Sequence, residues 1–505
     1  MNKYIKILMI IGVTMFSLTS CSDYLETNPS TSVADNTVFN TTQGAQSALY
    51  GCYFQFESGT GGTNRSDDWG YPTHQMTVDV DGEDVIARGW YYYDYSYWGH
   101  TRGDIFKTYA LWTFYYRLIN NTNSVITYID DATGTQQDKD YIKGQALALR
   151  GFAYFNLIRF FQQTYAIAKD MPGVPIYTTP TNDKTEGNPR GTVQDTYDQI
   201  LSDLTQAETL LTGYTRTNAT KNHIDKQVCE GILAEVYLTM NKWDEAADYA
   251  HTARTGYPLT SNKDYLSGFN DLSTSSWLWG IPQTKDQQLG DSSPFSMWSN
   301  WNRSNRGAWQ YNSFFLNDLF VNLFNDGDIR KDGDTGNDST NPVKCIHVYA
   351  GQWLNSSWKF RDNQEYLGSM VIMRSEVLLL DEIEALARGG NELGAKNLLW
   401  QLQDLRHATR TVSTGEDLIS DILKERRKEL YGEGFAWFDL KRCELGLKRE
   451  GAHQWCNGQK VFGPYSWRFV YQLPTTEIAN NKALNDGIWP AGDQTPFDGD
   501  FTPHR

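Results

Sequence analysis

The chain has 505 residues, with 45 lysines and arginines against 61 aspartates and glutamates, and a formal net charge of −16 at pH 7. This acidic excess argues against nucleic acid as a partner and against a basic surface that binds membranes. Aromatic residues make up 14% of the chain, with 17 tryptophans and 30 tyrosines among them. A core cannot absorb so many amphipathic rings, so we expect some of them at the surface.

The N-terminus has the order of features that is typical of a secretory signal. Two lysines precede an almost wholly apolar run, residues 7–16, and two small residues then precede Cys21. The apolar run is shorter than the ~20 residues that cross a bilayer as a helix. We predict a lipoprotein signal peptide over 1–20 that is removed, with lipid on the Cys21 thiol. An ordinary signal peptide with an incidental cysteine is the alternative.

Residues 21–40 are polar and small, which predicts a flexible, lipidated tether between the membrane and a folded body. Length alone would allow two or three domains in the remainder. A single domain over 41–505 is what the family resemblance described below implies.

The cysteines predict neither a disulfide scaffold nor a zinc site. Apart from Cys21 they are odd in number and widely spaced, and no CxxC motif occurs. Pairing of Cys443 with Cys456 stays open, although two free thiols are favoured. The full set beyond Cys21 is Cys52, Cys229, Cys345, Cys443 and Cys456.

Three blocks in the first half of the chain have apolar residues at helical spacing. They cover residues 104–130 and 138–164, and a third block whose N-terminal cap is Thr192. Two later segments, 227–258 and more weakly 376–409, match the spacing of a tetratricopeptide repeat, in which small residues let two helices approach closely. These patterns predict a mainly helical scaffold of helix pairs.

Two long segments between the helical blocks, 57–103 and 260–313, are rich in aromatic residues, glycine, serine and asparagine. Loops of this length in a compact protein are usually functional or disordered, and these are too aromatic for disorder. Residues 90–98 alone place seven rings in nine positions. Such rings can cover the apolar faces of a pyranose while polar neighbours bond its hydroxyls. Packing of the same rings onto the helical body is the alternative.

Six segments in the same order resemble the SusD/RagB family of outer-membrane lipoproteins. The resemblance covers nearly the whole chain, and its last segment, ILKERRKELYGEGFAWFDLKR, is the most specific. The segments are CSDYL (21–25), QALALRGFAYFNLIRFF (145–161), YDQILSDLTQAETLL (197–211), CEGILAEVYLTMNKWDEAADYA (229–250), MRSEVLLLDEIEALARGG (373–390) and the last one (422–442).

The resemblance implies a mainly α fold of the SusD type: four irregular tetratricopeptide-like helix pairs, with long loops and short strands packed on one side. It implies a lipoprotein of the outer membrane that faces the cell surface, is anchored by lipid alone, and binds oligosaccharide or polysaccharide without catalysis. The expected partner is a SusC-like TonB-dependent transporter that imports the glycan. A RagB-like lipoprotein that captures peptides is the alternative within the same architecture. No cofactor is implied.

The resemblance also implies a glycan site formed by two loops, near 65–103 and 276–312. Trp277 and Trp279 lie in the second loop but are flanked by apolar residues, so we expect them in the core. The residues predicted to contact carbohydrate are Asp81, Trp90, Tyr92, Tyr95, Trp98, Trp298, Trp301, Arg303 and Trp309.

Signals of catalysis or metal binding are weak. The chain has no HExxH, GxSxG, Walker A or GxGxxG motif. A carbohydrate hydrolase would need two facing carboxylates, and the acidic cluster 79–84 is the candidate. The alternative there is an acidic turn or a set of hydrogen-bond acceptors for sugar. Residues 326–338 fail the EF-hand pattern, which favours a solvated acidic loop over a calcium site. The charges of 424–430 favour a salt-bridged structural helix. We therefore expect no catalytic residue and no bound metal.

Overall fold

The computed structural model describes most of the chain beyond the predicted tether. The predicted signal peptide, Cys21 and the predicted tether up to residue 37 lie outside the described residues. The tether prediction, 21–40, is wrong at its end, because Phe39 is buried in the main apolar cluster and packs on Tyr128 with ring centroids 5.3 Å apart. Among the helices that the model describes, none combines the length and the apolar character needed to cross a bilayer. The described residues are 38–60, 67–87, 102–284, 293–298, 314–333, 345–348, 355–362, 367–450 and 460–484.

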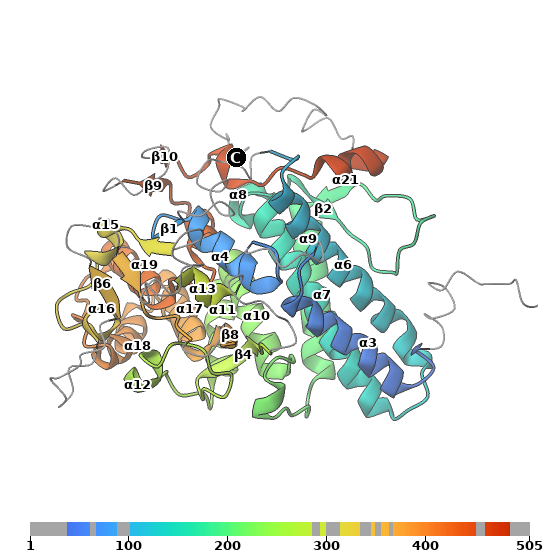
Figure 1. Ribbon diagram of the computed structural model, residues 1–505, viewed down its shortest axis with the longest axis horizontal. Helices are drawn as coiled ribbons and strands as arrows, with labels where there is room; N and C mark the ends of the chain where they lie inside the picture. The colour runs from blue at the N-terminus through green and yellow to red at the C-terminus, as the bar shows by residue number, and fades with distance from the viewer. Residues whose placement is uncertain are drawn as a thin grey trace, which may run out of the picture.

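The three helical blocks predicted in the first half of the chain are confirmed. They form α6 (Phe106–Tyr128), α7 (Gln136–Phe161) and α9 (Val193–Leu210), with α3 (Thr42–Phe54) packed against the first two. These long helices run side by side in Figure 1. Thr192 caps α9 as predicted, because its hydroxyl accepts from the Asp195 amide in a capping box.

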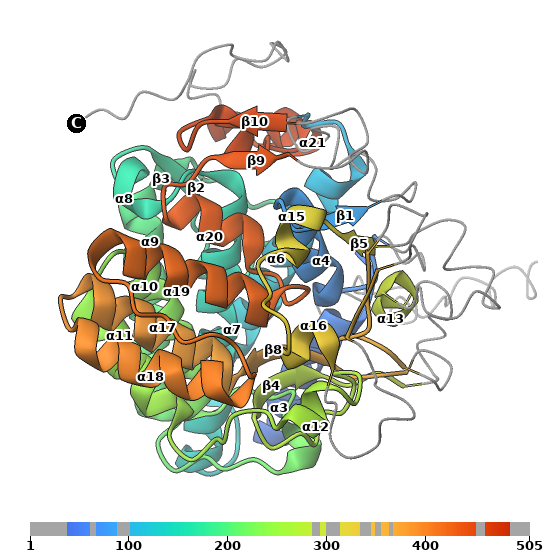
Figure 2. The ribbon, with the colours of Figure 1, turned by 90° about the vertical axis from the view of Figure 1, so that its left-hand side faces the viewer.

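Both predicted tetratricopeptide-like segments form helical hairpins. The first contains α10 (Lys226–Thr239) and α11 (Trp243–Arg254), and the second contains α17 (Ser375–Arg388) and α18 (Glu392–Leu405). Asn241 takes the turn position where glycine is usual and has a positive φ of 59°, a conformation that asparagine tolerates. Helices α11 and α17 pack together, which stacks the two hairpins although 120 residues separate them in sequence (Figure 2).

The charged segment 424–430 forms the end of α19 (Gly415–Leu430), which confirms the prediction of a structural helix. The next helix is α20 (Ala436–Arg442). The shorter helices are α4 (Tyr71–Asp81), α8 (Tyr165–Ala168), α12 (Asn262–Tyr265), α13 (Pro294–Trp298), α15 (Asp318–Val321), α16 (Ile329–Asp332), α21 (Thr475–Asn480) and the 3-10 turns η2 (Gln55–Glu57), η4 (Ile129–Asp131), η5 (Asn218–Thr220), η8 (Trp467–Phe469) and η9 (Lys482–Leu484).

The strands are short and all their pairings are antiparallel. One sheet has four strands in the order β1 (Val85–Ala87), β5 (Phe314–Leu316), β7 (Asn355–Ser357) and β6 (Ile346–Val348). The remaining strands form three pairs: β2 (Pro172–Pro175) with β3 (Arg190–Thr192), β4 (Trp277–Ile281) with β8 (Met370–Arg374), and β9 (Leu447–Arg449) with β10 (Lys460–Phe462). A mainly helical chain with short strands is the predicted fold class, and the structure confirms it.

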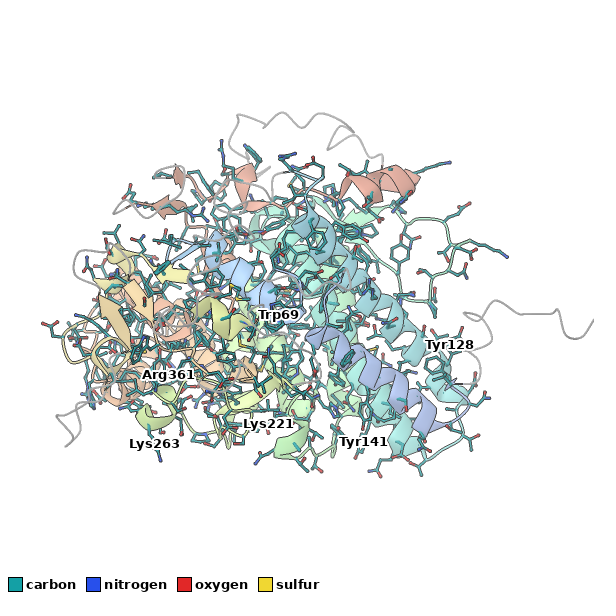
Figure 3. All side chains as sticks on the ribbon, in the orientation of Figure 1. Trp69, Tyr128, Tyr141, Lys221, Lys263 and Arg361 are labelled. Atoms are coloured by element: carbon teal, nitrogen blue, oxygen red, sulfur yellow. The ribbon has the colours of Figure 1, made fainter. Side chains whose placement is uncertain are left out.

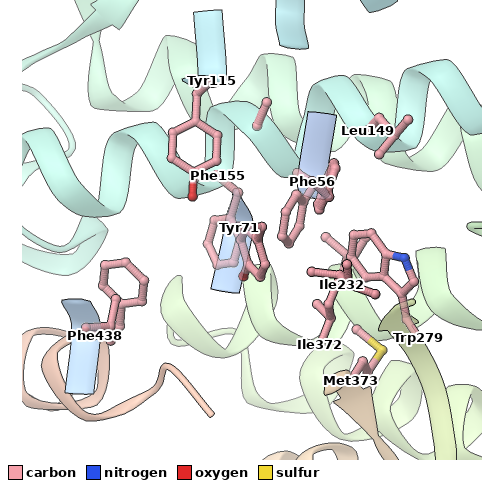
Figure 4. Packing of buried hydrophobic residues seen from close by; sticks show 14 of the residues in the cluster. Phe56, Tyr71, Tyr115, Leu149, Phe155, Ile232, Trp279, Ile372, Met373 and Phe438 are labelled. Atoms are coloured by element: carbon pink, nitrogen blue, oxygen red, sulfur yellow. The ribbon is translucent and has the colours of Figure 1, made fainter. Parts of the chain in front are cut away.

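The largest apolar cluster joins residues from Phe39 to Leu484. Figure 4 shows its centre, where rings from the first helices meet the β4–β8 pair. Trp279 lies 5.7 Å from Phe56 and 5.0 Å from Phe152, measured between ring centroids. Trp277 and Trp279 are each 1% exposed, so the prediction that they belong to the core is confirmed.

A second part of the interior is built from charges. Glu429 of α19 is fully buried and forms salt bridges with Arg330, Arg374 and Arg406, which are equally buried. Among the described residues, the cluster around Glu429 contains five cations and five carboxylates, so its formal charges balance. They are Arg330, Lys359, Arg374, Arg406 and Lys428, with Asp328, Glu376, Glu425, Glu429 and Glu433.

This cluster corrects the prediction of a solvated acidic loop at 326–338. Asp328 is fully buried, and Arg330 donates to both of its carboxylate oxygens at 2.9 and 2.7 Å. Within the described residues 326–333, Asp326 pairs with Lys331 and has the exposure that the sequence suggested, and Asp332 is partly exposed, whereas residues 334–338 lie outside the described part of the chain. The prediction was wrong for Asp328 because the sequence does not show that Arg330, two residues further along the chain, is buried against the distant Glu425 and Glu429 of α19.

Candidate functional site

The two predicted glycan loops are connected to neighbouring strands of the four-stranded sheet. Strand β1 leads directly into residues 88–101, and residues 299–313 lead directly into β5. The two strands pair antiparallel, with Ala87 opposite Phe314. Cross-strand partners lie about 4.5–5.5 Å apart. The sheet therefore brings together one end of each aromatic loop, although more than 200 residues separate them in sequence.

The two ends of the second loop are also held together. Trp298, which precedes residues 299–313, packs edge-on against Phe314, which follows them, with ring centroids 5.2 Å apart. Phe360 and Tyr431 pack on the same indole, at 5.4 and 6.4 Å. This aromatic cluster fixes the base of the loop by packing, independently of backbone pairing.

Trp298 was predicted to contact carbohydrate, but it lies in this buried aromatic cluster. Its side chain is fully buried, and its indole Nε1 has no hydrogen-bond partner among the described residues. A ring that is enclosed on all sides offers no face to a sugar. We remove Trp298 from the proposed ligand contacts and assign it to the support of the loop.

The first loop is supported through α4, which is buried along its whole length. The helix starts just after Trp69, which is 1% exposed and lies near the centre of the molecule in Figure 3. Gln75 of α4 donates to the carbonyls of Val371 and Glu433 at 2.9 and 3.1 Å. Because these partners belong to β8 and to the turn after α19, the helix that leads into β1 is fixed by the second half of the chain.

Asp81 lies at the end of α4. It was predicted to contact the ligand, but it too lies in the interior. It is fully buried, and its carboxylate accepts a hydrogen bond of 2.5 Å from the Tyr471 hydroxyl. Burial raises the pKa of Asp81, and this effect outweighs the hydrogen bond from Tyr471 and the nearby Arg449, which both lower it. The resulting pKa is about 7. Since no part of this carboxylate is exposed, we remove Asp81 from the proposed contacts.

The other carboxylates of the 79–84 cluster are held by separate structural partners. Asp79 accepts from the Gly434 amide at 2.8 Å, and burial raises its pKa to about 8. Arg427 of α19 binds Asp84 through two nitrogens and lies 3.1 Å from Glu83. Each acid is thus bound to a neighbouring element, which favours a structural role over the hydrolase alternative.

Arg449 completes the support of this segment. Its guanidinium is buried and donates to three successive carbonyls, those of Val80, Asp81 and Gly82, at 2.7–2.9 Å. Three parallel contacts satisfy the last carbonyls of α4, which have no partner within the helix. Neither Arg449 nor Tyr471 could be recognised from the sequence, because no local motif distinguishes them from surface residues.

Comparison with known proteins identifies the family of this architecture. A family model described as "Starch-binding associating with outer membrane" matches residues 67–238, and the model of the SusD family matches residues 229–486. The second match alone spans more than half of the chain. The chain belongs to the SusD family. The resemblance predicted from the six sequence segments is therefore confirmed, and the SusD family is one that is associated with the outer membrane.

Similar SusD-family proteins match along almost their whole length. "SusD-like protein P38" of Formosa agariphila is 24% identical, and the alignment covers 94% of this chain and 98% of that relative. A crystal structure of a "SusD-like carbohydrate binding protein" from Bacteroides vulgatus is 28% identical with a TM-score of 0.76, covering 88% of this chain and 98% of that one. A SusD superfamily protein from Bacteroides thetaiotaomicron is 25% identical with a TM-score of 0.73, over 88% and 99%.

Most of the predicted SusD-type ligand contacts lie outside the described residues. This holds for Trp90, Tyr92, Tyr95, Trp98, Trp301, Arg303 and Trp309, which remain predictions. Cys456 lies outside as well, while Cys443 is a free thiol whose pKa burial raises to about 12. Within the described ranges, no group of three histidine, cysteine, aspartate or glutamate side chains is placed to hold a metal ion.

Proposed function

We propose that the protein is a non-catalytic, cell-surface lipoprotein that captures oligosaccharide or polysaccharide for import by a SusC-like TonB-dependent transporter. Lipid on Cys21 anchors it to the outer membrane, and the polar residues 22–37 let the binding body move relative to the anchor. The observation that supports this most is the pairing of Ala87 with Phe314, since it brings the ends of two aromatic loops together.

The chemistry of the two loops favours carbohydrate over peptide. Residues 88–103 and 299–312 contain the tryptophan and tyrosine rings that are predicted to be exposed, together with arginine and asparagine side chains. Rings cover the apolar faces of a pyranose, and amide and guanidinium groups bond its hydroxyls. The similar Bacteroides vulgatus protein, named as carbohydrate binding, supports the same ligand class. Peptide capture would require a deeper and less aromatic groove.

Calorimetric titration of the purified protein with a panel of plant, algal and host polysaccharides tests the proposal. We expect one class of glycan to bind. We expect Trp98→Ala, Trp301→Ala and Trp309→Ala each to weaken that binding by about 5- to 150-fold, which corresponds to the loss of about 1–3 kcal/mol for one stacked ring. Trp243→Ala, in the partly buried start of α11 on the helical body, is the matched control.

Two outcomes contradict the proposal. Unchanged affinity in all three loop variants would exclude the aromatic loops as the site. Release of new reducing ends from a bound polysaccharide would show catalysis and favour the hydrolase alternative.

A further inference from the structure

A cleft of about 330 Å³ opens on the helical body, between the middle of α6, the segment that follows β2, and α21. Figure 1 shows these three elements together at one end of the molecule. The volume lies within the ~300–1,000 Å³ that is typical of small-molecule sites. None of its lining residues belongs to the predicted ligand contacts. The lining of the cleft includes Trp112, Tyr116, Asn120, Tyr177, Thr181 and Glu477.

One wall of the cleft is fixed by a buried polar network beneath it. Asn123 of α6 donates to the carbonyls of Tyr177 and Thr179, both at 3.0 Å. Arg150 of α7 donates to Asn123 Oδ1 at 2.8 Å and is itself held by both carboxylate oxygens of Asp203. Buried networks with all members satisfied rigidify the structure around them. The wall is therefore formed before any ligand arrives.

The rings in the cleft are also held in place. Tyr116 donates to the Pro175 carbonyl at 2.8 Å, and the Tyr177 hydroxyl accepts from the Asn188 amide at 2.9 Å. The two rings stand almost perpendicular, at 84°, with centroids 6.0 Å apart. Trp112 packs against Tyr116 at 4.7 Å. A corner of fixed aromatic rings offers a face and an edge to the C–H groups of one ligand.

Polar groups line the rest of the cleft. Asn120 Oδ1 accepts from the backbone and the hydroxyl of Thr181 at 2.7 and 3.0 Å, which fixes the plane of the amide, and its Nδ2 makes no hydrogen bond to the described residues. Arg117 is exposed and uses one amino group on the Thr60 carbonyl. Glu186 is exposed and Glu477 is partly exposed. The cleft thus offers donors and acceptors, with two carboxylates against one guanidinium.

We propose that this cleft is a second carbohydrate-binding site, which takes one or two neutral pyranose units. The inference of the ligand class rests on the proposed function. Tyr177 and Tyr116 contact the apolar faces of the ring, while Asn120, Arg117 and Glu477 bond its hydroxyls. The excess of carboxylates disfavours uronic acids and sulfated sugars. Two sites on one chain hold a long glycan more tightly than either site alone.

A blocking substitution tests the cleft without removing its supporting network. Thr113 lines the cleft and is partly exposed, so Thr113→Trp fills the space that a sugar would occupy. Thr205→Trp places the same residue on an exposed position of α9, outside the cleft, and is the matched control. The probes are neutral gluco-, manno-, galacto- and xylo-oligosaccharides, measured by calorimetry and by amide hydrogen exchange of residues 176–186. Equal melting temperatures establish that each variant is folded.

We expect a binding oligosaccharide to slow exchange in 176–186 of the wild-type protein and of a Trp98→Ala/Trp301→Ala variant. Thr113→Trp should abolish that protection and weaken this binding event at least tenfold, whereas Thr205→Trp should leave both unchanged. Glycan binding without protection of 176–186, or with Thr113→Trp identical to wild type, would overturn the cleft and leave the proposed function standing. Failure of the wild-type protein to bind any glycan, including the polysaccharide panel, would overturn both.

Discussion

Replacing Glu429 by glutamine tests whether the charged interior is a balanced unit. Oε1 of Glu429 accepts from Arg374 and Arg406 at 3.0 and 2.9 Å, and Oε2 accepts from Arg330 and Arg406, both at 3.1 Å. Each oxygen therefore meets two guanidinium donors. In whichever orientation the glutamine amide lies, its NH2 group faces two donors, and the cluster is left with one uncompensated positive charge.

The magnitude follows from the burial of the cluster. The three arginines are 0% exposed, so water cannot compensate the lost carboxylate. Removing one partner from a buried ion pair costs about 3–5 kcal/mol. We expect Glu429→Gln to lower the free energy of unfolding by about that amount at pH 7, measured by equilibrium urea denaturation followed by tryptophan fluorescence. Glu416→Gln, exposed in the first turn of the same helix, should cost less than about 1 kcal/mol.

The dependence on pH gives a second check. Burial alone would raise the pKa of Glu429, but Arg406, Arg374 and Arg330 together hold it well below its ordinary value. A depressed pKa contributes stability that is present above the unfolded pKa of about 4.3 and is lost as the pH falls further, toward the folded pKa. The difference between wild type and Glu429→Gln should therefore be constant above about pH 5 and shrink below pH 4. A loss under 1 kcal/mol, or one equal to that of Glu416→Gln, would refute a balanced charge cluster.

Three further predictions concern the predicted site and the anchor. Asp81→Asn should leave glycan affinity unchanged and should stabilise the protein at pH 8 but not at pH 4. Burial raises the pKa of Asp81 to about 7, so ionisation of its carboxyl group in the folded protein costs stability as the pH rises from about 4 through 7. Equal effects of the substitution at both pH values would contradict this. Trp298→Ala should lower the free energy of unfolding by about 3–5 kcal/mol, whereas a loss below 1 kcal/mol in thermal or urea unfolding would mean that the ring is not core. Cys21→Ala should abolish metabolic labelling with radioactive palmitate and release the protein from the membrane fraction, and labelling that persists would place the lipid elsewhere.

Much of the scaffold could be predicted because its signals are local. The apolar spacing of α6 and α7, the cap at Thr192 and the small residues of α10 and α11 all act within a few residues along the chain. Asn241 illustrates how tolerant these signals are. It departs from the glycine of the repeat pattern, yet it adopts the same positive φ, because its short polar side chain tolerates that conformation.

The candidate site could be predicted only as two regions. Trp277, Trp279 and Trp298 lie in the same aromatic stretch, and all three are buried, but apolar neighbours gave the signal for the first two alone. Trp298 has Met297 before it but polar residues after it in sequence, and it is enclosed by Phe360 and Tyr431, which lie 62 and 133 residues further along the chain. The cleft beside Tyr177 was missed for a similar reason, because Trp112 and Tyr116 fit an ordinary apolar helix face.

The helices, their hairpins and membership of the SusD family could be recognised from the amino-acid sequence alone, since each depends on residues that are close together in the chain. The export signal with Cys21 rests on the same kind of local pattern and stays a prediction. The packing of distant segments was needed to show that α19 lies within a cluster of buried charges, that Asp81 and Trp298 are fully buried, and that Ala87 meets Phe314. Burial and strand register are properties of segments that are far apart in sequence, and the chain fixes them only when those segments pack together.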